Sequence, residues 1–380
     1  MRSQFDSAVV GAGIIGLAHA YHLNRAGKQV VVFERGHLAQ GASVRNFGMV
    51  WPIGQPPGEM RSIALRSREV WLEALEAAAI WHQRCGSLHL AYHADEMAVL
   101  EEFVSLSSSL NYECEMVSPS FVAVSSPVVK QAGLEGAMWS PSELCVYPRQ
   151  VVRSLADYLA SQGVEFCFDT AVSSVSSGSV VAGGVSYSVA ETFICTGDDF
   201  ETLFPERFAS FGITRSKLQM LRIRPPSSDF LIGPHLCAGL TLGHYANFSI
   251  CSKLAALEER FKSSLPDHVR WGIHLLVSQH GDGGLTVGDS HEYGLGPSPF
   301  MSAEIEGLIL SYLDTFLPLE SLEVIERWYG VYAKHPSRPY VYDKPLPGVT
   351  LLTAVGGAGM TLSFGIAERS IAGGLTPLGL

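Results

Sequence analysis

The apolar residues of the chain form short continuous runs separated by stretches with helical spacing. The first two runs are 8–10 and 30–33, and between them residues 14–25 repeat apolar side chains as an amphipathic helix does. A short apolar run bounded by turn residues predicts a strand, and a 3.6-residue period predicts a helix. The first 34 residues therefore predict a strand, a helix and a second strand, in the order of a βαβ unit.

Similar patterns continue along the rest of the chain. Pro148 suits the first turn of one predicted helix, and Gly163 suits its end. Residues 41–52, rich in small and polar side chains, lack the pattern of an ordinary helix. No repeat or low-complexity linker interrupts the chain, so we expect its domains to be interleaved. The patterns predict helices over 61–80, 96–110, 149–162 and 363–372, and strands over 87–92, 136–139, 144–147, 164–168, 191–197 and 349–354.

The turn between the first strand and the first helix carries the glycine spacing of a dinucleotide-binding loop. Gly11 suits the tight turn, Gly13 lets backbone N–H groups approach a pyrophosphate, and Gly16 permits close contact between helix and strand. The positive end of the helix then points at the phosphates. Glu34 follows the second run, where a carboxylate accepts a hydrogen bond from a ribose hydroxyl and favours FAD or NAD over NADP.

The composition is that of a large folded protein with two domains. At 380 residues the chain exceeds the roughly 250–300 residues at which a single core stops growing. Hydrophobic residues make up 47% of the chain and charged residues only 17%. The net charge of -11 argues against a nucleic-acid partner, because phosphate backbones require a basic face. An anionic ligand would need local Arg, Lys and backbone N–H groups.

Cysteine usage and hydropathy give expectations about the compartment. The seven scattered cysteines form no Cys-x-x-Cys pair, which favours reduced thiols in a cytoplasmic protein over disulfides or a metal site. The first apolar stretch, 8–20, contains the glycine loop and is too polar for a signal peptide. No run approaches the roughly 18 apolar residues of a membrane span. An oligomer is compatible with this composition.

Two later turns also have features that suit a nucleotide cofactor. The run 191–197 ends in Thr196 and Gly197, where the backbone is able to pass close under a cofactor. The strand predicted at 349–354 is followed by the glycine-rich turn 356–361, a second strand-to-helix turn whose N–H groups suit an anion or an electron-rich ring. Either turn alone is equally well explained as structural, but their occurrence with the first loop favours a functional role.

These motifs, spread over nearly the whole chain, carry a family resemblance. They are the loop at 11–16 with Glu34, Ala42-Ser43-x-Arg45-Asn46-x-Gly48-Met49, Val146-Tyr147-Pro148-Arg149, Thr170-Ala171-Val172, Cys195-Thr196-Gly197, Trp328-Tyr329-Gly330 and the turn at 356–361. The chain resembles the D-amino-acid oxidase (DAO) superfamily of FAD-dependent oxidoreductases, which includes glycine oxidase and monomeric sarcosine oxidase. Residues 41–55 resemble a bacterial branch associated with phosphonate catabolism.

The resemblance implies an α/β fold with two interleaved domains. A Rossmann-like FAD-binding domain of the glutathione-reductase type would comprise 1–80, 146–215 and 328–380. A smaller α+β substrate domain, built on a mixed or antiparallel sheet, would comprise 81–145 and 216–327.

The resemblance also implies which residues contact FAD. The dinucleotide loop and Glu34 would hold the pyrophosphate and the adenosine ribose, and the other motifs would follow the phosphates, the adenine and the flavin ring. By position, the cofactor-binding residues would be Gly11, Gly13, Ile14, Ile15, Gly16, Glu34, Arg35, Ala42, Ser43, Arg45, Asn46, Gly48, Met49, Val172, Thr196, Gly197, Gly330, Gly357, Gly359, Met360 and Thr361.

The chemistry that the resemblance implies needs little from acid–base side chains. In this superfamily a C–H bond beside nitrogen gives hydride to flavin N5, the imine is hydrolysed, and the reduced flavin passes electrons to oxygen or another acceptor. The protein positions the carbon over N5 and excludes water. We therefore nominate no general base.

Departures from the better-known relatives bear on the substrate. Glycine and D-amino-acid oxidases place an Arg shortly after the Trp-x-Gly motif to clamp the substrate carboxylate, whereas here the stretch 328–331 is followed by Tyr332. Lys334, His335 and Arg338 come next and offer cationic groups for a different anion. The departure predicts a small amine substrate with an anionic tail.

Two more departures concern the flavin. Sarcosine oxidase attaches its flavin to a Cys where this chain has Gly330, so we expect non-covalent FAD. The lysine that activates oxygen in the sarcosine branch is replaced by Thr361, so both an oxidase and a dehydrogenase fit the sequence.

Other residues are candidates for the substrate pocket. His244 and Tyr245 belong to a polar and aromatic cluster, and Trp51 and Gln55 lie just beyond the flavin segment. A structural role for His244 and a solvated surface position for Lys334 are the alternatives.

The leading hypothesis is an FAD-dependent amine oxidoreductase that deaminates or dealkylates a small amine, such as an N-methylated aminoalkylphosphonate. The first alternative is a glycine, sarcosine or D-amino-acid oxidase that binds the carboxylate through other groups. The second is a flavin-bearing subunit of a complex without turnover of its own.

Overall fold

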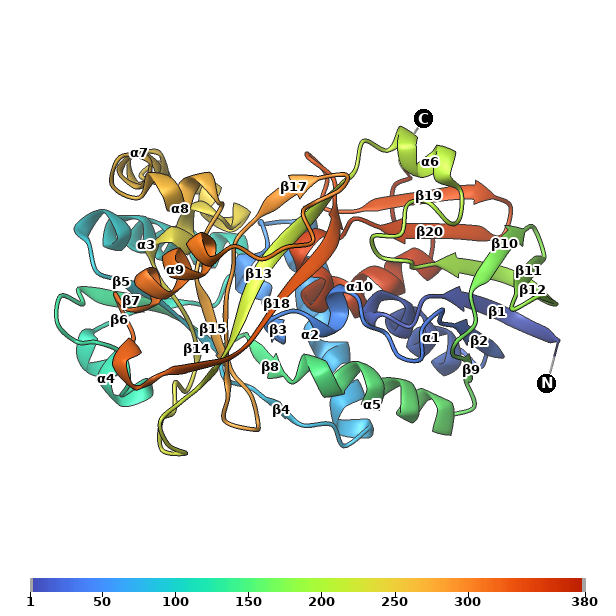
Figure 1. The fold of residues 1–380 in the computed structure, drawn as a ribbon, viewed down its shortest axis with the longest axis horizontal. Coiled ribbons are helices and arrows are strands. Elements are labelled where there is room, and N and C mark those ends of the chain that lie inside the picture. Colours follow the sequence, from blue (N-terminus) through green and yellow to red (C-terminus); the bar gives the residue numbers. More distant parts are fainter. Residues whose placement is uncertain (1–2, 378–380) are drawn as a thin grey trace.

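The computed structural model describes residues 3–377 and shows two halves, each centred on a sheet, which share the chain in alternating segments (Figure 1). The N-terminal strand and the C-terminal helix belong to the same half. No helix within 3–377 is long and apolar enough to cross a membrane.

The first sheet is built from the continuous apolar runs of the sequence. Its centre is parallel: β1 lies between β12 and β2, β9 flanks β2, and β20 pairs with the C-terminal part of β12. A hairpin of β10 and β11 extends the sheet in antiparallel fashion. The strands are β1 (Gln4–Val10), β2 (Val30–Phe33), β9 (Glu165–Cys167), β10 (Val172–Ser176), β11 (Ser179–Ala182), β12 (Val185–Ile194), β19 (Val341–Leu346) and β20 (Val349–Thr353).

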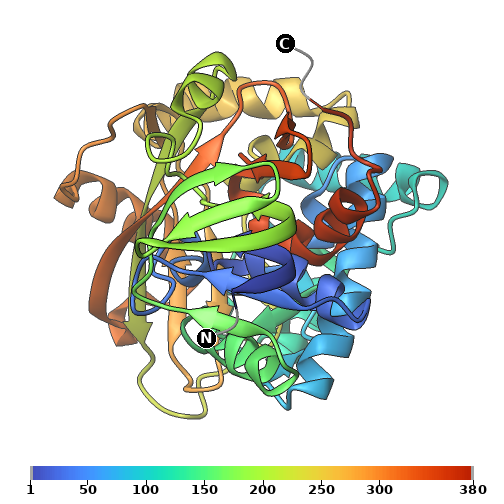
Figure 2. The same ribbon diagram turned by 90° about the vertical axis from the view of Figure 1, so that its right-hand side faces the viewer.

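Four helices pack together beside this sheet: α1 (Ile14–Arg25), α2 (Glu59–Ala77), α5 (Pro148–Ser161) and α10 (Gly359–Ile371) (Figure 2). Helices α2 and α10 approach closely because Gly365 has no side chain, and a Cβ there would lie 2.3 Å from the Ile63 carbonyl oxygen. The buried Trp71 indole Nε1 donates a hydrogen bond to the Met360 carbonyl oxygen at 2.7 Å. These contacts fix the start of α10 against the rest of the half.

The second sheet is mixed but mostly antiparallel. Strand β14 runs parallel to β5, and the other neighbours are antiparallel. Its longest ladder joins β13 to β18, two strands that reach toward the first half (Figure 1). The strands are β5 (Ser87–Ala91), β6 (Glu115–Val117), β7 (Gly136–Ser140), β13 (Thr214–Arg224), β14 (His235–Cys237), β15 (Leu276–Gln279), β16 (Leu285–Gly288), β17 (Glu292–Gly294) and β18 (Glu323–Lys334).

Shorter elements complete the structure. Helices α3 (Ala94–Ser107), α4 (Pro119–Ser125), α7 (Leu254–Ser264), α8 (Pro266–Arg270) and α9 (Ala303–Leu313) belong to the second half, and α6 (Pro205–Ser210) follows β12. A small sheet of β3 (Met49–Val50), β8 (Leu144–Val146) and β4 (His82–Gln83) brings the segment after β2 beside the chain that enters α5.

Most predicted elements are present, with small shifts at their ends. The stretch 41–52 forms two short 3-10 turns, η1 (Ala42–Val44) and η2 (Pro52–Gly54), around β3, as its lack of helical pattern predicts. Helix α2 ends at Ala77 instead of residue 80 because Ala79 takes a left-handed conformation, with φ of 50°. Helix α10 begins four residues before the predicted start, since the glycine turn itself becomes its first turn.

The strands of the first sheet all fall in the segments expected for a cofactor domain. The second sheet departs from the expected borders at two points: β13 begins at Thr214, before residue 216, and β18 crosses residue 328. The two halves are therefore joined by continuous strands.

Candidate active site

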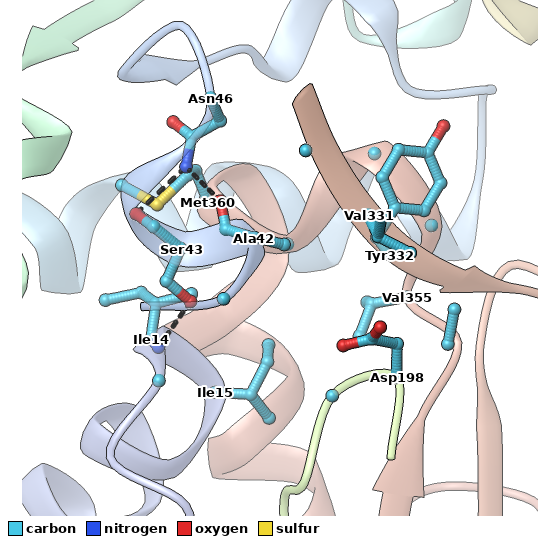
Figure 3. Close-up of a pocket in the computed structure, with 18 of the residues that line it drawn as sticks. Ile14, Ile15, Ala42, Ser43, Asn46, Asp198, Val331, Tyr332, Val355 and Met360 are labelled. Carbon is cyan, nitrogen blue, oxygen red and sulfur yellow. Dashed lines mark hydrogen bonds between the residues drawn. The ribbon is translucent and has the colours of Figure 1, made fainter. Parts of the chain in front are cut away.

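A large cavity lies where the carboxyl ends of β1, β2 and β12 meet the N-termini of α1 and α10 and the strand β18 (Figure 3). Ligands of open parallel sheets bind at this end of the strands. The cavity volume is about 1190 Å³, more than the roughly 300–1,000 Å³ of ordinary small-molecule sites. The space suits a dinucleotide together with a second small molecule.

Glycine at two positions lets the first loop come close to the strands. Gly11 has φ of +101°, and a Cβ there would lie 2.5 Å from the Cys195 carbonyl oxygen. At Gly16 a Cβ would lie 1.9 Å from the Gly11 carbonyl oxygen. The absence of side chains allows the N-terminus of α1 to face the cavity, where its free N–H groups suit a pyrophosphate.

Glu34 follows β2 and ties two turns together. Its Oε2 accepts a hydrogen bond from the Ala12 N–H at 2.9 Å, and its Oε1 accepts one from the Gly36 N–H at 3.0 Å. The carboxylate also lines the cavity, so it is fixed in place beside the position where a ribose would lie. The loop and this carboxylate fit the ADP part of FAD.

The segment after β2 is shaped by its own side chains (Figure 3). Ser43 Oγ accepts a hydrogen bond from the Ile14 N–H at 2.9 Å. This N–H is one of those at the start of α1 that have no carbonyl partner within the helix. The Asn46 amide donates to the Ala42 and Ser43 carbonyl oxygens, each at 2.9 Å, and accepts from the Gly48 N–H at 2.8 Å. Asn46 therefore holds the turn as well as lining the cavity.

The start of α10 forms the opposite side of the cavity. Thr361 Oγ1 accepts a hydrogen bond from the Trp51 N–H at 2.9 Å, which joins this turn to the segment after β3. A Cβ on Gly357 would lie 3.4 Å from the Tyr332 hydroxyl. The phenol of β18 thus lies over the glycine turn, in the part of the cavity that holds the predicted substrate-pocket residues and that we call the substrate end.

The substrate end is lined by aromatic and basic side chains. The rings of Trp51 and Tyr245 are 6.2 Å apart, and those of His244 and Tyr245 are 5.2 Å apart. Burial raises the pKa of Tyr332, so its hydroxyl is a neutral donor. Lys334 Nζ donates to the Tyr293 hydroxyl at 3.2 Å and lines the same wall.

All seven residues predicted for the substrate pocket line the cavity: Trp51, Gln55, His244, Tyr245, Tyr332, Lys334 and His335. His335 also accepts hydrogen bonds from the backbone N–H groups of Ser337 and Arg338, at 3.1 and 3.0 Å, which shapes the turn after β18. Gln55 is 7% exposed and is therefore more buried than His335.

Most residues predicted for the cofactor line it as well: Gly11, Gly13, Ile14, Ile15, Glu34, Arg35, Ala42, Ser43, Arg45, Asn46, Met49, Val172, Thr196, Gly197, Gly330, Gly357, Gly359, Met360 and Thr361. Gly16 and Gly48 are not among the lining residues. Gly48 has φ of +71° and a Cβ there would lie 2.0 Å from the Val146 carbonyl oxygen, so both glycines act through close packing.

Sequence reasoning missed three residues of the substrate end. His274, Asp289 and His291 also line the cavity, and each is less than a tenth exposed. Asp289 and His291 follow the apolar strand β16, so polar residues at the end of a buried run were the available signal. No local motif marks His274.

The chain matches the family described as DAO, FAD dependent oxidoreductase, over residues 6–371. It is 29% identical over 173 residues to a mouse pyruvate dehydrogenase phosphatase regulatory subunit, with 45% of this chain and 20% of that protein covered. It is 28% identical over 185 residues to a glycine oxidase of Bacillus licheniformis, with 47% of this chain and 48% of the relative covered.

A third relative is the 4-methylaminobutanoate oxidase (formaldehyde-forming) of Paenarthrobacter nicotinovorans, 27% identical over 172 residues, with 44% of this chain and 21% of the relative covered. The matched stretches thus span about half or less of the length of these relatives.

Two solved structures share the fold. Glycine oxidase from Geobacillus kaustophilus has a TM-score of 0.78 at 20% identity, covering 97% of this chain and 94% of that one. L-proline dehydrogenase from P. horikoshii has a TM-score of 0.79 at 18% identity, covering 100% and 96%. The predicted α/β fold with a Rossmann-like FAD-binding half is therefore confirmed.

Proposed function

Since the chain belongs to the DAO family of FAD-dependent oxidoreductases, we propose that it oxidises a small amine that carries an anionic group. The substrate is an N-methylated aminoalkylphosphonate or a close analogue, and the bond oxidised is the C–H bond beside the nitrogen. The names of two relatives, glycine oxidase and 4-methylaminobutanoate oxidase, support an amine substrate.

In this proposal FAD is bound without a covalent link by the segments 1–80, 146–215 and 328–380. The glycine loop and Glu34 would hold the ADP part, and the turn at the start of α10, which also lines the cavity, would serve the flavin part. When bound, FAD supplies a two-electron acceptor for the substrate C–H bond. Gly330 offers no side chain for a covalent attachment.

The observation that carries the substrate assignment is the wall of the cavity at β18. By the family resemblance, Tyr332 follows the Trp-x-Gly motif where glycine and D-amino-acid oxidases place an Arg that clamps the carboxylate. Lys334 follows two residues later, on the same face of the strand. A phenol and an ammonium recognise an anion without the planar bidentate geometry that matches a carboxylate. This pairing favours a tetrahedral anion such as a phosphonate.

The other side chains orient the amine and exclude water. Trp51 is 3% exposed, and its backbone N–H donates a hydrogen bond to Thr361 Oγ1. The residue therefore forms a rigid apolar wall next to Tyr245. A carbon placed against such a wall keeps only a few orientations, and this restriction is how a preorganised site accelerates the reaction. Hydrolysis of the imine product completes the reaction outside this wall.

Anaerobic reduction of the purified, FAD-loaded protein tests the proposal. The flavin absorbance is followed with N-methyl-2-aminoethylphosphonate, 2-aminoethylphosphonate, sarcosine, glycine and D-alanine. We expect bleaching by a phosphonate at the lowest concentration. Bleaching confined to the carboxylates would overturn the phosphonate assignment and favour a glycine, sarcosine or D-amino-acid oxidase.

A matched pair of lysine variants tests the anion site. Lys334→Gln removes the ammonium of a residue that lines the cavity, whereas Lys344→Gln removes the ammonium of a residue on β19 that does not line it. We expect the apparent KM for the phosphonate to rise at least tenfold in the first variant only. Equal KM values in the two variants contradict a role for Lys334.

The mouse regulatory subunit among the relatives favours a second candidate, a flavin-bearing subunit without turnover. A yellow protein whose flavin is not bleached by any of the amines supports this candidate and excludes the first.

A further inference from the structure

Three imidazoles meet at the substrate end of the cavity. The ring centroids of His244 and His274 are 3.7 Å apart, those of His244 and His291 are 4.6 Å apart, and those of His274 and His291 are 5.2 Å apart. One ring nitrogen of each lies within 4.8 Å of the others. They come from three separate segments: the end of a 3-10 turn, the loop before β15 and the loop between β16 and β17.

The partners of two of these rings decide which nitrogen keeps its lone pair. His291 Nδ1 lies 3.0 Å from the Gly272 carbonyl oxygen, which only accepts, so Nδ1 carries the proton and Nε2 the lone pair. His274 Nε2 lies 2.9 Å from Asp289 Oδ1, an ion-pair distance without hydrogen-bond geometry, and the negative carboxylate favours a proton on this nitrogen. Nδ1 of His274 then keeps a lone pair, and this atom is buried with no hydrogen-bond partner among residues 3–377.

This arrangement is the one that metal sites use. Imidazole ligands of metals donate their other N–H to a carboxylate or a backbone carbonyl. His291 is positioned in this way toward the Gly272 carbonyl oxygen, and His274 Nε2 lies beside the Asp289 carboxylate. Two of the rings are 3% and 6% exposed, whereas His244 exposes its ring to the cavity. The third side of the cluster is therefore open to an incoming ion and to a further ligand.

From this geometry we propose that His244, His274 and His291 bind a divalent transition-metal ion, with zinc as the probe. Three atoms within 4.8 Å of one another share a point at most about 2.8 Å from each, and Zn–N bonds are about 2.0–2.1 Å. Each nitrogen must move by less than 1 Å to close the site, and the stacked rings of His244 and His274 must also rotate so that their in-plane lone pairs converge. At least one coordination position is left toward the cavity, for water or an oxygen ligand.

The hydrogen-bond pattern of the cluster favours a metal ion over an anion. His291 Nε2 and His274 Nδ1 offer lone pairs to a cation, whereas an anion requires N–H donors at these positions.

The other ionisable groups around the cluster are Asp289 on the loop after β16, Lys334 and Tyr332 on β18, Tyr293 on β17 and Tyr245. The positive charge of Lys334 repels a bound cation, and the negative charge of the buried Asp289 carboxylate offsets this repulsion.

Zinc binding to the FAD-loaded protein tests the site. The protein is incubated with zinc chloride, passed through a desalting column and analysed for zinc and flavin, and a chromogenic chelator gives the affinity by competition. We expect one zinc per chain. The visible ligand-field bands of a cobalt-substituted sample report tetrahedral nitrogen ligation independently of activity.

Variants assign the zinc to the cluster. His244→Gln removes a ligand that faces the cavity and is not part of the core, and we expect its affinity to fall at least a hundredfold. Asp289→Asn keeps all three ligands and is expected to weaken binding 10–100-fold. His82→Gln, outside the cavity, is the matched control and is expected to bind zinc normally.

Lack of stoichiometric zinc in the unaltered protein overturns this inference, and so does unchanged affinity in His244→Gln. Retained flavin absorbance and an unchanged thermal midpoint show that each variant is folded. Amine-dependent bleaching of the metal-free protein tests the proposed function separately, so either proposal can fail alone.

Discussion

The close contact at Gly16 gives the sharpest prediction for cofactor binding. In Gly16→Ala the new Cβ would lie 1.9 Å from the Gly11 carbonyl oxygen and 3.2 Å from Val9 Cγ1. Real Cβ atoms essentially never come within 3.0 Å of such an atom, so α1 must retreat by about 1 Å. The main obstacle is the backbone of Gly11, and no side-chain rotation relieves that contact.

The expected loss of stability follows from two opposing contributions. Replacing a helical Gly by Ala favours the helix by about 1 kcal/mol. Overpacking costs about 1–3 kcal/mol, and a rigid backbone contact places this site at the upper end. We expect the apoprotein to lose about 2 kcal/mol of unfolding free energy in total.

The loss of cofactor affinity is larger. A helix displaced by about 1 Å no longer places its first N–H groups within hydrogen-bond distance of a pyrophosphate. Two hydrogen bonds to charged oxygens, at about 1.5 kcal/mol each, correspond to a roughly hundredfold increase in the FAD dissociation constant.

The assays are urea unfolding of the apoprotein and titration with FAD followed by quenching of flavin fluorescence. Gly307→Ala is the matched control, because Gly307 lies within α9 and a Cβ there would meet no atom within 4 Å from elsewhere in residues 3–377. It is expected to stabilise the protein by up to about 1 kcal/mol and to leave FAD binding unchanged. A Gly16→Ala protein as stable as the control, with FAD affinity within threefold of the original, would refute the packing argument.

Three further predictions follow from single side chains. Glu34→Gln removes the negative charge of a side chain that accepts hydrogen bonds from two backbone N–H groups. The FAD dissociation constant should therefore rise about tenfold in equilibrium titrations. An unchanged dissociation constant contradicts the assignment of Glu34 to the ribose. Tyr332→Phe should raise the KM for an anionic amine several-fold in steady-state assays and leave FAD affinity unchanged, and an altered affinity instead would place the phenol on the cofactor. Burial lowers the pKa of His19 to about 4, below its unfolded value of 6.5, so the unfolded state takes up the proton first and stability falls as the pH drops from 6.5 to 4. The loss of unfolding free energy from this group approaches about 3 kcal/mol. The urea midpoint of His19→Gln should therefore depend less on pH than that of the unaltered protein, and the same pH dependence in both would contradict the prediction.

Much of the cofactor half could be predicted from the sequence because its signals are local. Continuous apolar runs marked the strands, and the spacing of Gly11, Gly13 and Gly16 marked the loop, since each glycine answers a steric demand set by near neighbours. The membership of the DAO family and the FAD-binding fold are confirmed. The phosphonate branch stays a prediction.

The role of some residues required the structure. The sequence assigned Gly48 to the cofactor, but the contact that requires glycine there is with the Val146 carbonyl oxygen, about a hundred residues away. Asn46 is likewise occupied by three hydrogen bonds within its own turn. Sequence identifies that such residues matter, whereas the partner depends on how distant segments pack.

The sequence by itself determined the cofactor half, because backbone conformation and hydrophobic period are encoded by residues close together in the chain. Seven residues of the substrate end were predicted from the sequence, but only the tertiary structure decided how they are arranged and which other residues join them. His244, His274 and His291 share no motif, and Tyr332 and Lys334 acquire their place from the register of β18 on β13. These groups are separated by tens of residues or more along the chain. Strand pairing and loop packing bring them within a few ångströms of one another, and no local sequence pattern encodes this proximity.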